Sequence, residues 1–156
     1  MESKAARLVA LLKERELTIT TAESLTGGRI AGAITAVSGS SAVFPGGVVS
    51  YCDRIKHGIL QVPQDLLDTY GAVSEPVAKA MARGAARCME TDLALSATGL
   101  AGPEGDGRHP VGTVYLGLYA RGEVRCERRI FSGSREEVRE QSVRRALEMA
   151  LEWLIK

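Results

Sequence analysis

LTITTAESLTGGRIAGAITAV, residues 17–37, is the segment from which the fold class follows most directly. It opens with residues 17–21, a short run rich in β-branched side chains that predicts a strand. A polar turn with two adjacent glycines comes next, and residues 29–37 are typical of a helix. A strand, a turn and a helix in this order begin a βαβ unit, so the segment predicts an α/β protein.

The rest of the chain continues this alternation and then changes to a hairpin. Ser74 is a favourable N-cap for one of the later helices. Helices are expected over 3–16, 53–60, 63–69, 75–89 and after the capping-box sequence SREE at 134–137. Strands are expected over 46–51, 92–97, 111–120 and 123–131, the last two joined by Arg121-Gly122. We therefore expect a single domain over residues 1–156 with an α/β fold, a three-layer α/β/α sandwich with a mixed β-sheet.

The balance of charge argues against a nucleic-acid-binding protein. The 20 basic and 19 acidic side chains leave a formal net charge of +1, whereas proteins that grip nucleic acid usually present a basic face. The three cysteines form no C-x-x-C pair, so neither a zinc site nor a disulfide framework is expected. The chain shows no secretory h-region and no apolar run of about 18 residues. We therefore expect a cytoplasmic protein without a membrane partner.

The turn after the first strand is a candidate site for chemistry. Ser24 and Thr26 offer hydroxyl groups there, and Gly27 and Gly28 let a ligand approach the backbone. Free N–H groups at the start of the following helix would favour an anion or a developing oxyanion. The alternative is that Ser24 or Thr26 merely caps that helix, since both residue types are common N-caps.

Two further strand ends carry groups of the same kind. Tyr51 ends the second strand and Lys56 follows it near the start of a helix, where a desolvated lysine could act as a base for a serine. A solvated helix lysine is the alternative. After the next strand, Thr98, Gly99 and Gly102 lie in a loop that either wraps a ligand or is simply flexible. No G-x-G-x-x-G or P-loop sequence is present, so ATP, NAD and metal cofactors are not expected.

The basic region over residues 125–145 contains one candidate anion-binding residue, Arg135. Arg135 is expected in a turn at a helix N-terminus, where a guanidinium and backbone N–H groups can hold a phosphate together. Arg139 follows one helical turn later. Acidic residues interleave with the arginines of this region, so a solvated face of ion pairs is the alternative for most of them.

Taken together, these segments resemble the C-terminal domain of the CinA (competence/damage-inducible) family. The matching stretches run in family order: TAESLTGG at 21–28, SGSSAVFPGGVVSYCDRIK at 38–56, YGAVSEPVA at 70–78, ATGLAGPEGDGRHPVGTVYLGL at 97–118 and FSGSREEVREQSVRRAL at 131–147. Free-standing members of this family are nicotinamide mononucleotide deamidases. The resemblance therefore implies hydrolysis of nicotinamide mononucleotide to nicotinate mononucleotide and ammonia, in pyridine-nucleotide salvage, without a cofactor.

The resemblance also implies roles for individual residues. The family serine, tyrosine and lysine fall on Ser24, Tyr51 and Lys56, as nucleophile, proton relay and base. The family threonine falls on Thr98 and the arginine on Arg135, so that these two, with the glycine loop and Arg139, would bind the substrate. The family name keeps a second hypothesis open, a non-catalytic nucleotide-binding or regulatory module. A third hypothesis is an interaction domain, and a homodimer or higher homo-oligomer is expected.

Three positions depart from the usual family sequence. Leu25 stands where many members have cysteine, so a thiol at this position is not required. Cys52-Asp53-Arg54 replaces a more usual Ser-Asn-Glu, which adds charge beside Tyr51 and could alter substrate preference. Ser134 stands where aspartate is common. None of the three removes a proposed catalytic group, and the hypothesis depends on Ser24 and Lys56 meeting at one pocket.

Overall fold

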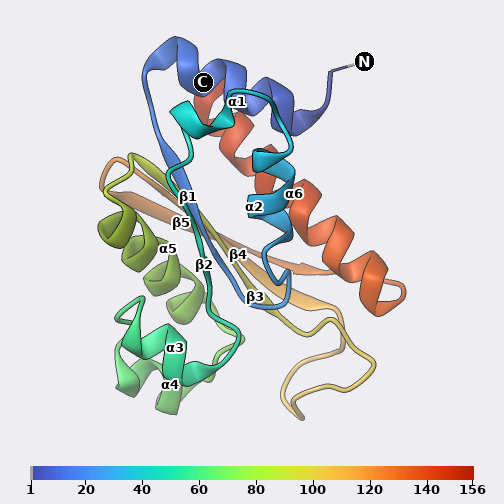
Figure 1. Cartoon of the computed structure of the whole chain (residues 1–156). Coiled ribbons are helices and arrows are strands. Elements are labelled where there is room, and N and C mark those ends of the chain that lie inside the picture. Colours follow the sequence, from blue (N-terminus) through green and yellow to red (C-terminus); the bar gives the residue numbers. More distant parts are fainter. Residues whose placement is uncertain (1) are drawn as a thin grey trace.

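The computed structural model describes residues 2–156, which contain one mixed five-stranded sheet (Figure 1). The strand order is β2-β1-β3-β4-β5. β1 runs parallel to β2 and β3, whereas β4 is antiparallel to β3 and β5 is antiparallel to β4. The strands are β1 Ile19–Glu23, β2 Val48–Val49, β3 Leu93–Gly99, β4 Thr113–Ala120 and β5 Glu123–Ile130.

Helices cover both faces of this sheet, as Figure 1 shows. The helices are α1 Lys4–Arg15, α2 Arg29–Thr35, α3 Asp53–Gly58, α4 Gln64–Tyr70, α5 Glu75–Met89 and α6 Arg135–Ile155, with a 3₁₀ turn at Ser40–Ala42. α1, α2 and α6 lie on one face, and α5 lies on the other with α3 and α4 beside it. The expected three-layer α/β/α sandwich with a mixed sheet is confirmed, and Met1 lies outside the described residues. None of the helices in residues 2–156 is long and apolar enough to cross a membrane.

The central strand β3 separates two hydrophobic cores. Leu93 and Leu95 point into the larger core, which is shared with α1, α2 and α6. Ala94, on the opposite face of the strand, packs in the smaller core under α5. Because successive side chains of a strand point to opposite faces, a strand covered on both sides has a nearly continuous apolar sequence. The strand expected over residues 92–97 has such a sequence.

Most element boundaries agree with the sequence-based expectation, but one strand is shorter than expected and one N-cap residue makes a different hydrogen bond. The strand expected over 46–51 is reduced to Val48–Val49; the N–H of Ser50 still donates to the carbonyl of Glu23 in β1, but its carbonyl accepts a hydrogen bond from Lys56. Ser74 stands at the N-cap of α5, but its hydroxyl donates to the carbonyl of Gly71 rather than accepting from the helix. The capping box of Ser134 and Glu137 at the start of α6 is confirmed.

The turn of the β4–β5 hairpin shows why its sequence was recognisable. Arg121 and Gly122 have φ values of 47° and 92°. A two-residue hairpin turn of this hand requires positive φ at both central positions, which glycine adopts without strain. The hairpin completes the sheet on the side away from β2.

The topology brings three loops together at the carboxyl ends of the parallel strands. β1 and β3 are parallel neighbours, so the turn that follows Glu23 and the loop that follows Gly99 leave the sheet at the same end. The chain after β2 leaves at that end as well, because β2 is parallel to β1. In α/β sheets, ligands bind at the carboxyl ends of the strands.

Candidate active site

A cavity of about 410 Å³ lies where these three loops meet the start of α6. Its wall includes Ser24 from the turn after β1, Tyr51 from the β2–α3 connection and Arg135 from α6. The remaining lining residues are Leu25 and the loop residues Gly99, Leu100, Ala101, Gly102, Pro103, Glu104 and Gly105. The volume falls within the range of small-molecule sites, which are usually about 300–1,000 Å³.

Ser24, which lines this cavity, is in direct contact with Lys56, which lies behind it and is not a lining residue. The Lys56 Nζ donates a hydrogen bond to Ser24 Oγ at 3.1 Å and another to the carbonyl of Ser50 at 2.9 Å. Lys56 is 1% exposed, and Ser24 is 8% exposed. The Ser24 backbone is itself fixed, because its N–H donates to the carbonyl of Ala97 in β3 at 2.9 Å. The alternative of a solvated helix lysine is therefore wrong for Lys56.

Burial gives Lys56 the electrostatics of a base. Desolvation lowers the pKa of its ammonium group below the ordinary value of 10.5, and this effect outweighs the opposing influence of Asp53 and Cys52. The nearest carboxylate oxygen, Oδ1 of Asp53, lies 4.0 Å from Nζ, and the Asp53 side chain is 57% exposed. Taking an ammonium out of water disfavours the charged form. A lysine in this state can take a proton from a hydroxyl.

The start of α2 is occupied by a carboxylate that the sequence analysis did not identify. Glu23 is fully buried, and its two carboxylate oxygens accept from the N–H groups of Ile30 at 2.8 Å and Ala31 at 2.9 Å. This pairing satisfies the helix N-terminus, so neither Ser24 nor Thr26 acts as its cap. The only available signal was a glutamate at the end of a buried strand, just before a polar turn.

The two glycines of the turn do not lie on the cavity wall. The Gly27 N–H donates to the carbonyl of Ser24 at 3.1 Å and is thus already engaged. Gly28 has φ 101° and stands at the N-cap of α2. The expectation that these glycines hold an oxyanion is corrected accordingly, and Leu25 is the residue after Ser24 that does line the cavity.

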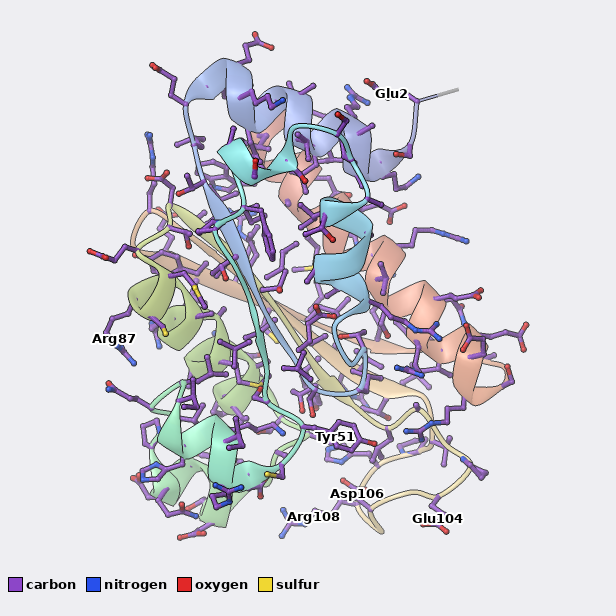
Figure 2. The ribbon with its side chains drawn as sticks, viewed as in Figure 1. Glu2, Tyr51, Arg87, Glu104, Asp106 and Arg108 are labelled. Carbon is purple, nitrogen blue, oxygen red and sulfur yellow. The ribbon has the colours of Figure 1, made fainter. Side chains whose placement is uncertain are left out.

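Arg135 joins two of the loops across the mouth of the cavity. One guanidinium nitrogen donates to the carbonyl of Gly102 at 2.8 Å, and the other donates to the hydroxyl oxygen of Tyr51 at 3.1 Å. Tyr51 is 63% exposed, and Figure 2 shows it reaching from the β2–α3 connection toward the loop that carries Glu104 and Asp106. Residues that are far apart in sequence thus form one polar rim.

Three of the predicted substrate-binding residues lie behind the wall rather than on it. Thr98 is buried, and its hydroxyl donates to the carbonyl of Ala72 at 2.9 Å, away from the cavity lining. Arg139 donates from Nε to the carbonyl of Leu25 at 2.9 Å and supports the turn after β1. Thr26 is fully buried, and its hydroxyl has no partner within the described residues. Gly99, Gly102 and Arg135 are the predicted substrate-binding residues that do line the cavity.

The metal-ligating side chains are dispersed. Within residues 2–156, no three His, Cys, Asp or Glu side chains come together in a group that could hold a metal ion. His109 pairs instead with Asp106 in the long loop, with Nδ1 3.0 Å from the carboxylate. The polar groups of the cavity are the Ser24 hydroxyl with the buried Lys56 amine behind it, the Tyr51 hydroxyl, the Arg135 guanidinium, the Glu104 carboxylate and backbone amides.

The CinA C-terminal domain model matches residues 1–154 of the chain. The chain belongs to this family. Among curated relatives, a CinA-like protein of Citrifermentans bemidjiense is 50% identical over 150 residues, which cover 96% of this chain and 36% of that protein. A putative competence-damage inducible protein of Lactiplantibacillus plantarum is 47% identical over 86% of this chain and 32% of its own length. The chain thus spans about a third of the length of the curated relatives it matches.

Crystal structures of CinA superfamily proteins have the same fold. One from Klebsiella pneumoniae superposes with a TM-score of 0.95 at 36% identity, covering 97% of this chain and 96% of that one. The competence/damage inducible protein CihA from Agrobacterium tumefaciens gives a TM-score of 0.93 at 42% identity, with 98% and 94% of the two chains covered. The fold of the CinA C-terminal domain is therefore shared along nearly the whole chain.

Proposed function

We propose that this CinA domain is a serine amidohydrolase that removes ammonia from the carboxamide of nicotinamide mononucleotide. The observation that supports this proposal best is the contact between the buried amine of Lys56 and the hydroxyl of Ser24 at a cavity of substrate size. Burying a lysine lowers the stability of the fold, so a lysine in this place suggests a function. An amine with a lowered pKa beside a hydroxyl can activate a serine nucleophile without a histidine.

The two groups suffice for a balanced reaction. Ser24 Oγ attacks the carboxamide carbon while its proton passes to Lys56 Nζ, and the C–N bond then breaks as Lys56 returns that proton to the leaving nitrogen. Ammonia departs and leaves an ester on Ser24. Water then attacks this ester, gives its proton to Lys56, and Lys56 returns the proton to the departing Ser24 oxygen. The product is the carboxylate form of the nucleotide.

The wall around the pair supplies the remaining interactions of this proposal. The backbone N–H of Leu25 follows the nucleophile at the cavity, and we assign it to the developing oxyanion, a role worth roughly 3–4 kcal/mol per donor. Arg135 is the guanidinium on the wall and is assigned to the phosphate, with the glycine-rich loop around it. Tyr51, held by Arg135, borders the space for the pyridine ring and is proposed to relay to the leaving ammonia the proton that Lys56 returns.

The first prediction tests the activity and its nucleophile together. Purified protein should release ammonia from nicotinamide mononucleotide, and Ser24→Ala should lower kcat by about 10⁴-fold or more because the covalent route is lost. Coupled detection of ammonia gives the rate, and mass spectrometry gives the one-dalton gain of the product. Full activity in Ser24→Ala would reject the covalent route, whereas tight mononucleotide binding without turnover would favour the regulatory module that the relatives' names suggest.

A further inference from the structure

The group that most opposes the effect of burial on the pKa of Lys56 comes from the same helix. Asp53 begins α3 one turn before Lys56, and its Oδ1 lies 4.0 Å from Nζ. The two side chains differ in their contact with solvent, because the lysine side chain is 2% exposed and the aspartate 57%. The carboxylate is therefore solvated, whereas the amine on which its electric field acts is shielded from water.

The other polar and titratable groups around this site come from several elements. Ser24, from the turn after β1, offers a neutral hydroxyl, and Ser50, at the end of β2, offers a carbonyl. Cys52, at the N-cap of α3, raises the pKa of Lys56 less than Asp53 does. Glu23 is buried at the end of β1, where its carboxylate accepts hydrogen bonds from the start of α2. Glu104 and Arg135 line the same cavity from the long loop and from α6.

We propose that Asp53 is a positioning residue for the proton of the Ser24–Lys56 pair and sets the pH range in which the pair works. This inference rests on the proposed amidohydrolase function. The negative charge holds the proton on Lys56 against the desolvation that would remove it. The carboxylate thus moves the acid limb of the reaction to higher pH and keeps an ammonium present to protonate the leaving nitrogen. An uncharged residue at position 53 would free the base at lower pH.

The kinetic test is Asp53→Asn, which keeps the shape of the side chain and removes the charge. Because the Asp53 side chain is 57% exposed, solvent screens its interaction with Lys56, so we expect the acid limb of the kcat/KM profile to move down by about half a pH unit. At a pH below both midpoints this shift is about a threefold gain in kcat/KM. The matched control is Asp65→Asn in the first turn of α4, which changes the net charge equally. Its profile should coincide with that of the wild type.

Salt provides a second arm of the same test. Raising the ionic strength from about 0.05 to 0.5 M shortens the screening length from roughly 14 to 4 Å, so it should weaken the exposed carboxylate's field. The wild-type midpoint should move toward that of Asp53→Asn, while the midpoint of the variant stays in place. Coincident midpoints of wild type and Asp53→Asn at low salt would overturn the inference.

A direct titration separates this inference from the proposed function. The chain has five lysines, so the side-chain signals of protein with ¹³C-labelled lysine can be followed individually by NMR. The Lys56 signal is identified by its loss in Lys56→Met. A lower midpoint for this signal in Asp53→Asn supports the inference even if no ammonia is released, which would count against the proposed reaction alone. An unchanged midpoint overturns the inference even in an active enzyme.

Discussion

The burial of Lys56 is expected to lower the stability of the protein. The Lys56 amine is almost fully removed from water and has two uncharged hydrogen-bond partners, Ser24 Oγ and the Ser50 carbonyl. An ammonium in such a place is destabilising unless it is well paired, and the nearest carboxylate is mostly solvated. Functional sites often retain such groups at the expense of stability.

We therefore predict that Lys56→Met stabilises the protein and abolishes the reaction. The free energy of unfolding should rise by about 1–2 kcal/mol at pH 7, because the desolvation of an ammonium outweighs two hydrogen bonds. The pKa of Lys56 is lowered in the folded state. Its penalty is therefore fully present below the folded pKa and disappears as pH rises to the unfolded value of about 10.5.

Urea unfolding across this pH range measures the effect. The gain of Lys56→Met over wild type should shrink steadily as the buffer is made alkaline. Lys79→Met, at a surface ion pair with Glu75, is the control and should change stability by less than about 1 kcal/mol. A loss of stability in Lys56→Met at pH 7 would show that the hydrogen bonds outweigh the buried charge.

At the scale of elements, the position of α3 depends on a close contact made by α5. Gly84 lies in the middle of α5, and a Cβ at that position would collide with the backbone carbonyl of Leu60 in the α3–α4 connection. Arg87, one turn later, donates to the same carbonyl at 3.2 Å. The α3–α4 connection is thus held against α5. This connection follows directly after α3, the helix that carries Lys56.

Gly84→Ala should consequently destabilise the fold and disturb the candidate active site at a distance. Backbone atoms cannot yield as a flexible side chain can, so we expect a loss of at least about 2 kcal/mol in spite of alanine's higher helix propensity. The melting temperature and the rate of ammonia release should both fall. Gly32→Ala is the matched control, because nothing lies within 4 Å of a Cβ at that helical glycine. It should gain up to about 1 kcal/mol, and an equal response of the two variants would contradict the packing argument.

At the scale of the whole molecule, α6 connects the two ends of the sandwich. Near its start, Glu136 forms a bidentate pair with Arg29 of α2, at 2.7 Å for each bond. Further along, Arg145 binds Glu127 of the edge strand β5 at 2.6 and 2.9 Å. These ion pairs tie together elements that are distant in sequence, and the first of them lies one residue from Arg135 at the cavity.

The Glu127–Arg145 pair predicts a loss of stability in acid. Hydrogen bonds from Arg145, and secondarily from Arg129, lower the pKa of Glu127 below its ordinary value of 4.5. Its contribution is therefore present above that value and is lost as pH falls through the folded pKa. Glu127→Gln should reduce the free energy of unfolding by about 1 kcal/mol at pH 7 and by less at pH 3. Urea unfolding at both pH values tests this, with Glu123→Gln, exposed on the same strand, as control.

The sequence by itself determined the layers of this molecule and the neighbourhood of its site. Periodicity and turn residues are local properties, so the helices, the Arg121-Gly122 hairpin and the Ser134 capping box could be predicted from short segments. The strand-end rule for α/β sheets then indicated which loops would carry chemistry. The resemblance to the CinA family added which side chains those would be, including Ser24 and Lys56.

The tertiary structure alone decided which of these side chains face the cavity. Burial of Lys56, the capping of α2 by Glu23 and the turning of Thr98 toward Ala72 each depend on contacts between segments far apart in the chain. Such contacts are fixed by the packing of whole layers, and a local sequence pattern carries no information about them. A hydroxyl or a lysine has the same sequence signal whether it faces water, a ligand or a carbonyl, and only its three-dimensional surroundings determine its chemistry.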